Sequence, residues 1–212
     1  MRILAIESSG PVAGIAIADN GVVRAEFSLN DGRTHSEKLL PLIDAALNAL
    51  SLEASDMDCF AVSVGPGSFT GLRIGVATAN ALAFAAGKPV VQVPTLSALM
   101  RCATAGRVLA LLDAGNARAY SAYYEYSVEI WGPEALPLAE IPGRVPFDAV
   151  TVGDLGADAA KALGLSFSHA LPRAALVAEA AAELAAQGCF VKEARPLYLL
   201  KPQAQRTLEG KP

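Results

Sequence analysis

The sequence contains few of the residues that build metal sites, disulfides or charged surfaces. Among its 212 residues are 3 cysteines and 2 histidines, and 18% of the residues are charged. The cysteines are odd in number and far apart, which indicates a reducing compartment and no disulfide framework. Each lies in an apolar stretch, so we expect buried thiols. His35 and His169 are too few and too far apart for a histidine-based metal site.

Basic residues are also scarce, and the formal net charge is −4. Affinity for nucleic acid comes mostly from Lys and Arg side chains that neutralise phosphates, so the sequence argues against RNA or DNA binding by this chain alone. The nearly uncharged apolar run at residues 74–87 has about 14 residues, fewer than the ~20 that span a bilayer. The N-terminus starts a strand rather than a signal peptide. We therefore expect a cytoplasmic protein without membrane contact.

Apolar residues are abundant, at 53% of the chain, and this content predicts a folded protein with a large core. Alanine accounts for about one residue in five, and much of it lies in expected helices at residues 76–86 and 174–186. Small side chains allow helices to approach closely and lose little entropy in a helix. A high-GC coding bias explains the same excess equally well.

Hydrophobic patterning predicts an α/β protein with an internal duplication. Residues 2–6 form a strand, and the turn Asp19-Asn20-Gly21 joins the next two strands. A helix follows at residues 35–50, and a strand at 59–64 leads into a second helix. Residues 107–115 then match residues 2–10 at four of nine positions. We expect a subdomain at residues 1–105, a smaller one at 106–200 and a polar tail at 201–212.

Loops of small residues lie at three strand ends, residues 8–10, 65–68 and 113–115, and they have two interpretations. Such loops either cradle phosphate with their backbone N–H groups or form tight turns that need glycine. The loop at residues 65–68 is not a P-loop, because its glycine spacing differs and no Lys-Ser/Thr follows. Either Ser68 or Thr70 is expected to cap the next helix. The candidate phosphate-loop residues are Glu7, Ser8, Gly65, Gly67, Ser68 and Asp113.

Acidic residues end both matching strands. Glu7 and Asp113 are either a carboxylate pair that holds Mg²⁺ and positions a nucleophile, or two solvated acids at loop mouths. The sequence has no Gly-x-Ser-x-Gly, His-Glu-x-x-His or Cys-x-x-Cys motif. No nucleophile and base are therefore paired by a recognisable pattern.

The segment Gly65-Pro66-Gly67-Ser68-Phe69-Thr70-Gly71-Leu72-Arg73-Ile74-Gly75 resembles the signature of the TsaB (YeaZ) family, and Pro196-Leu197-Tyr198-Leu199 also matches. The resemblance spans nearly the whole chain. It implies a duplicated actin/sugar kinase/Hsp70-like (ASKHA) fold with a shortened second half. It also implies the non-catalytic role of that family in threonylcarbamoylation of adenosine 37 of tRNA, known as t6A modification.

The same resemblance implies partners and an interface. Family members pair with the catalytic paralogue TsaD, recruit TsaE, form homodimers in isolation and meet tRNA only through the complex. The metal-binding histidines of TsaD correspond to Thr95 and Leu99 here, so the resemblance implies that this chain has no metal or cofactor of its own and that ATP/ADP and metal belong to its partners. The interface would use the first two helices, with candidates His35, Leu39, Arg73, Ile74, Ala77 and Ala81.

Two other classes of function are open at this stage. A small ATP-dependent kinase of the same superfamily would need acidic residues in both phosphate loops. The family often has Asp where this chain has Glu7, and Arg where it has Gly115. A peptidase is the weakest alternative, because no protease constellation is present.

Overall fold

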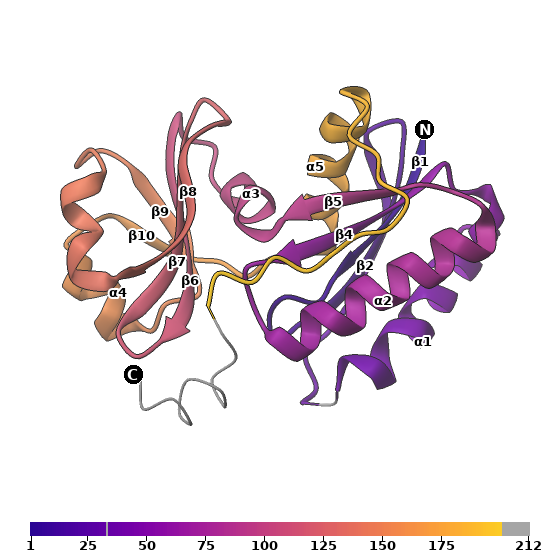
Figure 1. The fold of residues 1–212 in the computed structure, drawn as a ribbon, viewed down its shortest axis with the longest axis horizontal. Helices are drawn as coiled ribbons and strands as arrows, with labels where there is room; N and C mark the ends of the chain where they lie inside the picture. The colour runs from indigo at the N-terminus through magenta and orange to yellow at the C-terminus, as the bar shows by residue number, and fades with distance from the viewer. Residues whose placement is uncertain (33, 201–212) are drawn as a thin grey trace. The chain divides into compact units, whose positions relative to one another are not determined.

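A computed structural model describes residues 1–32 and 34–200, and these form two compact units (Figure 1). The first unit contains residues 1–98 and 172–197, and the second contains residues 99–171 and continues from Tyr198. The chain thus returns to its first unit near the end, whereas the sequence placed one boundary at residues 105/106. The expected polar tail at residues 201–212 lies outside the described residues.

The first unit is built on a mixed sheet with the strand order β3-β2-β1-β4-β5. Its strands are β1 (Arg2–Glu7), β2 (Ala13–Asp19), β3 (Val22–Leu29), β4 (Cys59–Gly65) and β5 (Val90–Pro94). The strands β1, β4 and β5 run parallel, and β2 and β3 form an antiparallel hairpin. The predicted turn between β2 and β3 is confirmed, because Asn20 and Gly21 both have positive φ angles, of 51° and 79°.

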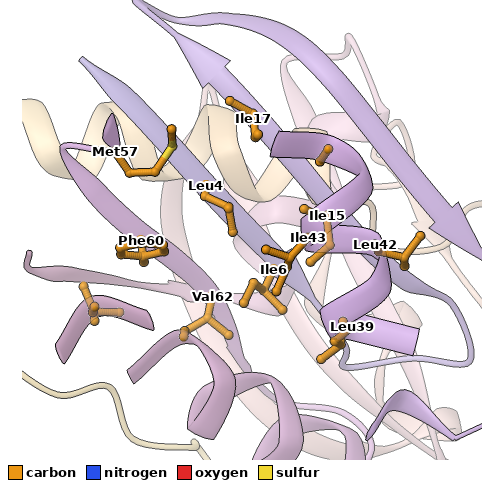
Figure 2. Close-up of a cluster of buried hydrophobic side chains, with 14 of the residues drawn as sticks. Leu4, Ile6, Ile15, Ile17, Leu39, Leu42, Ile43, Met57, Phe60 and Val62 are labelled. Carbon is orange, nitrogen blue, oxygen red and sulfur yellow. The ribbon is translucent and has the colours of Figure 1, made fainter. Parts of the chain in front are cut away.

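The two faces of this sheet carry different side chains. Leu4 and Ile6 point towards α1 (His35–Ala49) and α2 (Phe69–Ala86), where Leu39 and Leu42 meet them in one hydrophobic cluster (Figure 2). The alternate residues Ile3 and Ala5 point to the opposite face, which α5 (Ala174–Ala186) covers (Figure 1). This alternation follows from the two-residue period of a strand.

Alanine lines the contact between α5 and the sheet. On the sheet side, the face under α5 includes Ala5, Ala16, Ala18 and Ala61, and the buried side of α5 is itself mostly alanine. Small residues on both surfaces let a helix lie close to a sheet. Part of the alanine excess therefore has a structural use within the chain's own core.

The segment after α5 closes the first unit as an extended strap, defined here as residues 189–197. Val191 exchanges two backbone hydrogen bonds of 2.9 Å with Val90 of β5. The side-chain amide of Asn80 on α2 donates to the carbonyl oxygen of Ala194 and accepts from its N–H group, at 3.0 and 2.8 Å. These bonds fix the strap across α2 and the edge of the sheet.

The second unit repeats the sheet of the first. Its strand order is β10-β9-β6-β7-β8, in which β6 pairs antiparallel with β7 and parallel with β9, as β1 does with β2 and β4. Arg2 forms an ion pair with Asp19 opposite it, and Arg107 forms one with Glu125. The shared topology and register confirm the predicted duplication.

The elements of this unit are shorter than their counterparts on the parallel side of the sheet. The strands are β6 (Arg107–Gly115), β7 (Arg118–Glu125), β8 (Val128–Pro137), β9 (Val150–Gly153) and β10 (Phe167–His169). The helix between β9 and β10 is α4 (Ala157–Leu163), with 7 residues against 18 in α2. The short helix α3 (Thr95–Leu99) and a 3-10 turn, Met100–Cys102, precede β6. The expected shortening of the second half is thus seen in its helical crossover.

The cysteines differ in their surroundings. Cys59 is buried in β4, and its burial raises the thiol pKa to about 11. Cys102 and Cys189 are exposed, so the expectation of three buried thiols was wrong for these two. Cys102 ends the 3-10 turn after α3, and Cys189 follows α5 next to the exposed Phe190, so an apolar neighbourhood in sequence did not imply burial at either position.

Among the described residues, α2 is the one helix that is long and apolar enough to cross a membrane. A third of this helix is buried, and its Val76, Ala79 and Ala83 belong to the same core cluster as β1 and β4. Core helices pass the same test of length and composition.

Candidate functional site: the β4–α2 turn and the outer face of α2

The signature segment forms a sharp turn from β4 into α2. Gly65 has a φ of 120°, and the peptide bond between Gly65 and Pro66 is cis. The hydroxyl of Ser68 accepts a hydrogen bond from the N–H of Gly71 at 3.2 Å, so Ser68 rather than Thr70 caps the helix. The hydroxyl of Thr95 accepts from the N–H of Gly65 at 3.1 Å and holds the other side of the turn.

This turn packs closely against the segment that follows β1. A Cβ on Gly67 would lie 2.5 Å from the carbonyl oxygen of Ser9, and one on Gly71 would lie 2.1 Å from that of Ser8. A Cβ on Gly75, one helical turn further, would lie 2.0 Å from the hydroxyl oxygen of Ser8. The glycines are needed because backbone meets backbone here.

Several N–H groups of the two loops, those of Ser8, Ser9 and Ser68 among them, bond within the chain. Ser68 donates to the carbonyl oxygen of Ser9 at 2.7 Å. Ser9 in turn donates its N–H to Oε1 of Glu7 at 2.6 Å, and Ser8 donates to the hydroxyl oxygen of Ser63 at 3.5 Å. The candidates Glu7, Ser8, Gly65, Gly67 and Ser68 are thus brought together in one network. This arrangement favours the tight-turn interpretation over a phosphate cradle.

Glu7 is the buried acidic residue of this network. Its side chain is 1% exposed, and burial raises its pKa above the ordinary value although hydrogen bonds from Ser9 oppose that shift. Its Oε2 atom has no hydrogen-bond partner among the described residues. Glu7 therefore sits in an environment that favours the protonated carboxyl.

Asp113 is exposed and belongs to the second unit. It accepts from the N–H of Gly115 at 2.8 Å, and its own N–H donates to Asp154 at 2.7 Å. Burial raises the pKa of Asp154. Within the described chain, no group of three or more His, Cys, Asp or Glu side chains is arranged to hold a metal ion. The pairing of Glu7 with Asp113 stays a prediction.

The interface candidates lie in three kinds of environment. Arg73, Ala77 and Ala81 are exposed and spaced four residues apart, so they form one stripe on the outer face of α2. Ile74 is half-buried and packs against the core beneath the helix. Leu39 is 1% exposed and lies inside the cluster of Figure 2, so its side chain cannot meet a partner directly.

His35 lies at the first turn of α1, half-buried beside the segment after Ser9. Its pKa is lowered by burial and by the nearby charge of Lys38, while hydrogen bonds with the backbone of Gly10 and Val12 oppose the shift. Its Nε2 atom is buried without a partner in the described structure. His35 therefore supports the loop from α1 as a neutral side chain.

Two exposed apolar residues extend the outer face and were missing from the sequence-based candidates. Phe84 on α2 is 87% exposed and Leu40 on α1 is 57% exposed. Phe84 lies off the spacing that defines the buried side of α2, whereas Leu40 lies three residues before the buried Ile43, at the edge of the buried side of α1. A large apolar residue outside the core periodicity was the signal that could have identified Phe84.

Comparisons with known proteins fit this geometry. The family model described as "TsaD: tRNA N6-adenosine threonylcarbamoyltransferase" matches residues 23–145. The tRNA threonylcarbamoyladenosine biosynthesis protein TsaB of Escherichia coli is 32% identical over 231 aligned positions, which cover 100% of both chains. The chain belongs to the TsaB family. TsaB of Bacillus subtilis is 34% identical over 59% of this chain and 56% of its own.

Solved structures agree with the family and the fold. YeaZ from Pseudomonas aeruginosa superposes with a TM-score of 0.80 at 27% identity, covering 93% of this chain and 99% of that one. The ethanolamine utilization protein EutJ from Carboxydothermus hydrogenoformans has a TM-score of 0.53 at 12% identity, with 86% and 89% covered, and shows the fold alone. The predicted ASKHA fold class is confirmed.

Proposed function

We propose that this chain is the non-catalytic partner of TsaD in the synthesis of threonylcarbamoyladenosine in tRNA. Its TsaB-family membership supports the pathway, because curated relatives are named for tRNA threonylcarbamoyladenosine biosynthesis. The side chains at the positions of the TsaD metal ligands support the non-catalytic role. Thr95 holds the β4–α2 turn and Leu99 is fully buried, and neither residue type provides an imidazole ligand.

The observation that carries the proposal is the outer face of α2. This helix carries one charged residue, Arg73, and is mostly apolar, yet only a third of it is buried in its own unit. Its exposed stripe of Arg73, Ala77 and Ala81 continues to Phe84, and the guanidinium of Arg73 lies 3.9 Å from the centre of the Phe69 ring. Small and apolar residues that stay exposed together on one helix face are typical of a protein–protein interaction site, so this face fits a surface that a partner covers.

The small alanine side chains of this face allow a partner helix to approach closely. Ala77 and Ala81 leave the helix backbone accessible, so a partner helix can approach to the short end of the usual interaxial range. Leu40 of α1 is also exposed and apolar. We infer that α1 and α2 pair with two helices of TsaD, or of a second copy of this chain in the absence of TsaD.

The other roles follow from this pairing. TsaD would supply the metal site and the transfer chemistry, and TsaE would bind the pair with its ATP. The net charge of −4 favours tRNA contact through the partners rather than through this chain. A tRNA-modifying complex works in the cytoplasm, and we assign the chain to that compartment.

Reconstitution of the modification tests the proposed function. Purified TsaD, TsaE and tRNA are incubated with threonylcarbamoyl-adenylate and ATP, with or without this chain, and the modified nucleoside is quantified by mass spectrometry. Modification should depend on the added chain. Full modification in its absence would refute the role, and tight ATP binding by the isolated chain in a calorimetric titration would favour the kinase alternative.

A further inference from the structure

A second surface lies at the C-terminal end of α2, where the strap passes the helix. A groove of about 600 Å³ is formed there within the first unit. The helix end and the residues after it form one wall, and the strap forms the other. The lining residues are Ala83, Phe84, Gly87, Lys88, Pro89, Phe190, Val191 and Lys192.

The groove has an apolar interior between two aromatic side chains. Phe84 is 87% exposed on the helix side, and Phe190 is 42% exposed on the strap side. The strap is held in place because Val191 pairs with Val90 through two backbone hydrogen bonds and packs on the core. The groove is therefore preformed, which lowers the entropic cost of binding.

Two lysines border this apolar interior. Lys88 follows the helix, Lys192 lies on the strap, and neither has an ion-pair partner among the described residues. Two unpaired cations at one groove stand out in a chain with a net charge of −4. Their charge complements a carboxylate placed next to an apolar side chain.

The lining favours a peptide over RNA. None of the eight lining residues is an arginine, the residue that contacts phosphate in a bidentate manner. A protein segment brings one or two carboxylates and supplies apolar side chains for the interior.

We propose that this groove binds a short segment of a partner protein in which an aromatic or leucine side chain is flanked by acidic residues. The groove shares Phe84 with the outer face of α2, but none of Arg73, Ala77 and Ala81 lines it, and its other wall is formed by Phe190 and Lys192 of the strap. The proposal therefore goes beyond pairing with TsaD. It adds a second docking position on the same unit.

Selection from a random 12-residue peptide library displayed on phage tests the proposal on the full chain. The selected peptides should be enriched in Phe, Trp or Leu next to Asp or Glu. A synthetic peptide from this set, labelled with fluorescein, is then titrated with wild type, Phe190→Ser and Lys192→Glu. Both variants change exposed strap residues and leave α2 intact. Each should weaken binding by about tenfold or more.

The matched control is Lys161→Glu, which makes the same change in net charge on the exposed surface of α4 in the other unit. It should change the affinity by less than about twofold. The proposal is overturned if selected peptides show no acidic and apolar enrichment, or if the strap variants bind as wild type does. It is also overturned if an oligouridine RNA binds the groove and displaces the peptide. Pairing with TsaD, measured in parallel, should be unchanged in both strap variants.

Discussion

The amide N–H of Ser68 donates a hydrogen bond to the carbonyl oxygen of Ser9 over 2.7 Å. This bond joins the first turn of α2 to the loop after β1, at a point where glycines allow the two backbones to touch. It explains why the family signature has glycine at positions 67 and 71, where a Cβ would collide with the backbone of the loop after β1. The signature positions α2, and α2 presents the surface that we assign to the partner.

Replacing Gly71 with alanine should disrupt this junction. Alanine would normally stabilise a helical position by up to about 1 kcal/mol, but its Cβ would lie 2.1 Å from the carbonyl oxygen of Ser8. We expect the free energy of unfolding to fall by about 2 kcal/mol or more in urea titrations. The control is Gly10→Ala, because a Cβ at Gly10 meets nothing within 4 Å. Equal stabilities of the two variants would contradict the close packing.

The buried carboxyl of Glu7 should make stability depend on pH. Its pKa in the folded state is raised by burial above the ordinary 4.5. The stabilising contribution of the protonated form is therefore complete below that value and is lost as pH rises through the folded pKa. Glu7→Gln keeps an uncharged acceptor for Ser9. The free energy of unfolding of wild type should fall relative to this variant as pH rises above 4.5 towards the raised pKa of the folded state.

Urea titrations across that range measure this difference. Glu179→Gln, at an exposed position on α5, is the control for removing a surface carboxylate. Curves for wild type and Glu7→Gln that stay parallel over the whole range would show that Glu7 does not titrate with folding.

The strap should loosen when Asn80 is replaced with alanine. The Asn80 side chain makes two hydrogen bonds with the backbone of Ala194, a residue that is 2% exposed. Their loss leaves buried backbone groups unpaired, at a cost of about 1–3 kcal/mol. Amide exchange at Ala194 should accelerate, as measured by hydrogen–deuterium exchange. The exposed Asn48→Ala is the matched control, and exchange that does not differ between the two variants would rule out the tether.

Local patterns predicted much of the fold. The Asn20-Gly21 turn, the strand at the N-terminus and the repeat at residues 107–115 are short-range signals, and the structure confirms each of them. The return of α5 and the strap to the first unit could not be predicted in this way. It depends on contacts such as Asn80 with Ala194, which are 114 residues apart, and an alanine-rich helix does not specify which sheet it covers.

In the candidate site too, short-range spacing could be predicted from the sequence and long-range contacts could not. Arg73, Ala77 and Ala81 share one face because helical spacing fixes their relation, and the structure leaves that face exposed. Leu39 was taken as an interface candidate although its own spacing placed it with the core residues of α1, and it is buried. Whether Ser8 and Ser68 cradle an anion depended on where their N–H groups point, and that required the positions of Glu7, Ser63 and Ser9.

We propose that the outer face of α2 supports tRNA modification by pairing this non-catalytic chain with TsaD. The most direct test is the reconstituted modification reaction with Ala81→Glu, titrated alongside wild type while pairing is followed by analytical ultracentrifugation. An unpaired carboxylate buried in the interface should abolish pairing. If α2 pairs with TsaD, the Ala81→Glu variant should lose tRNA modification together with pairing and should keep its free energy of unfolding. Full modification by a variant that no longer pairs with TsaD would show that pairing through α2 is not required.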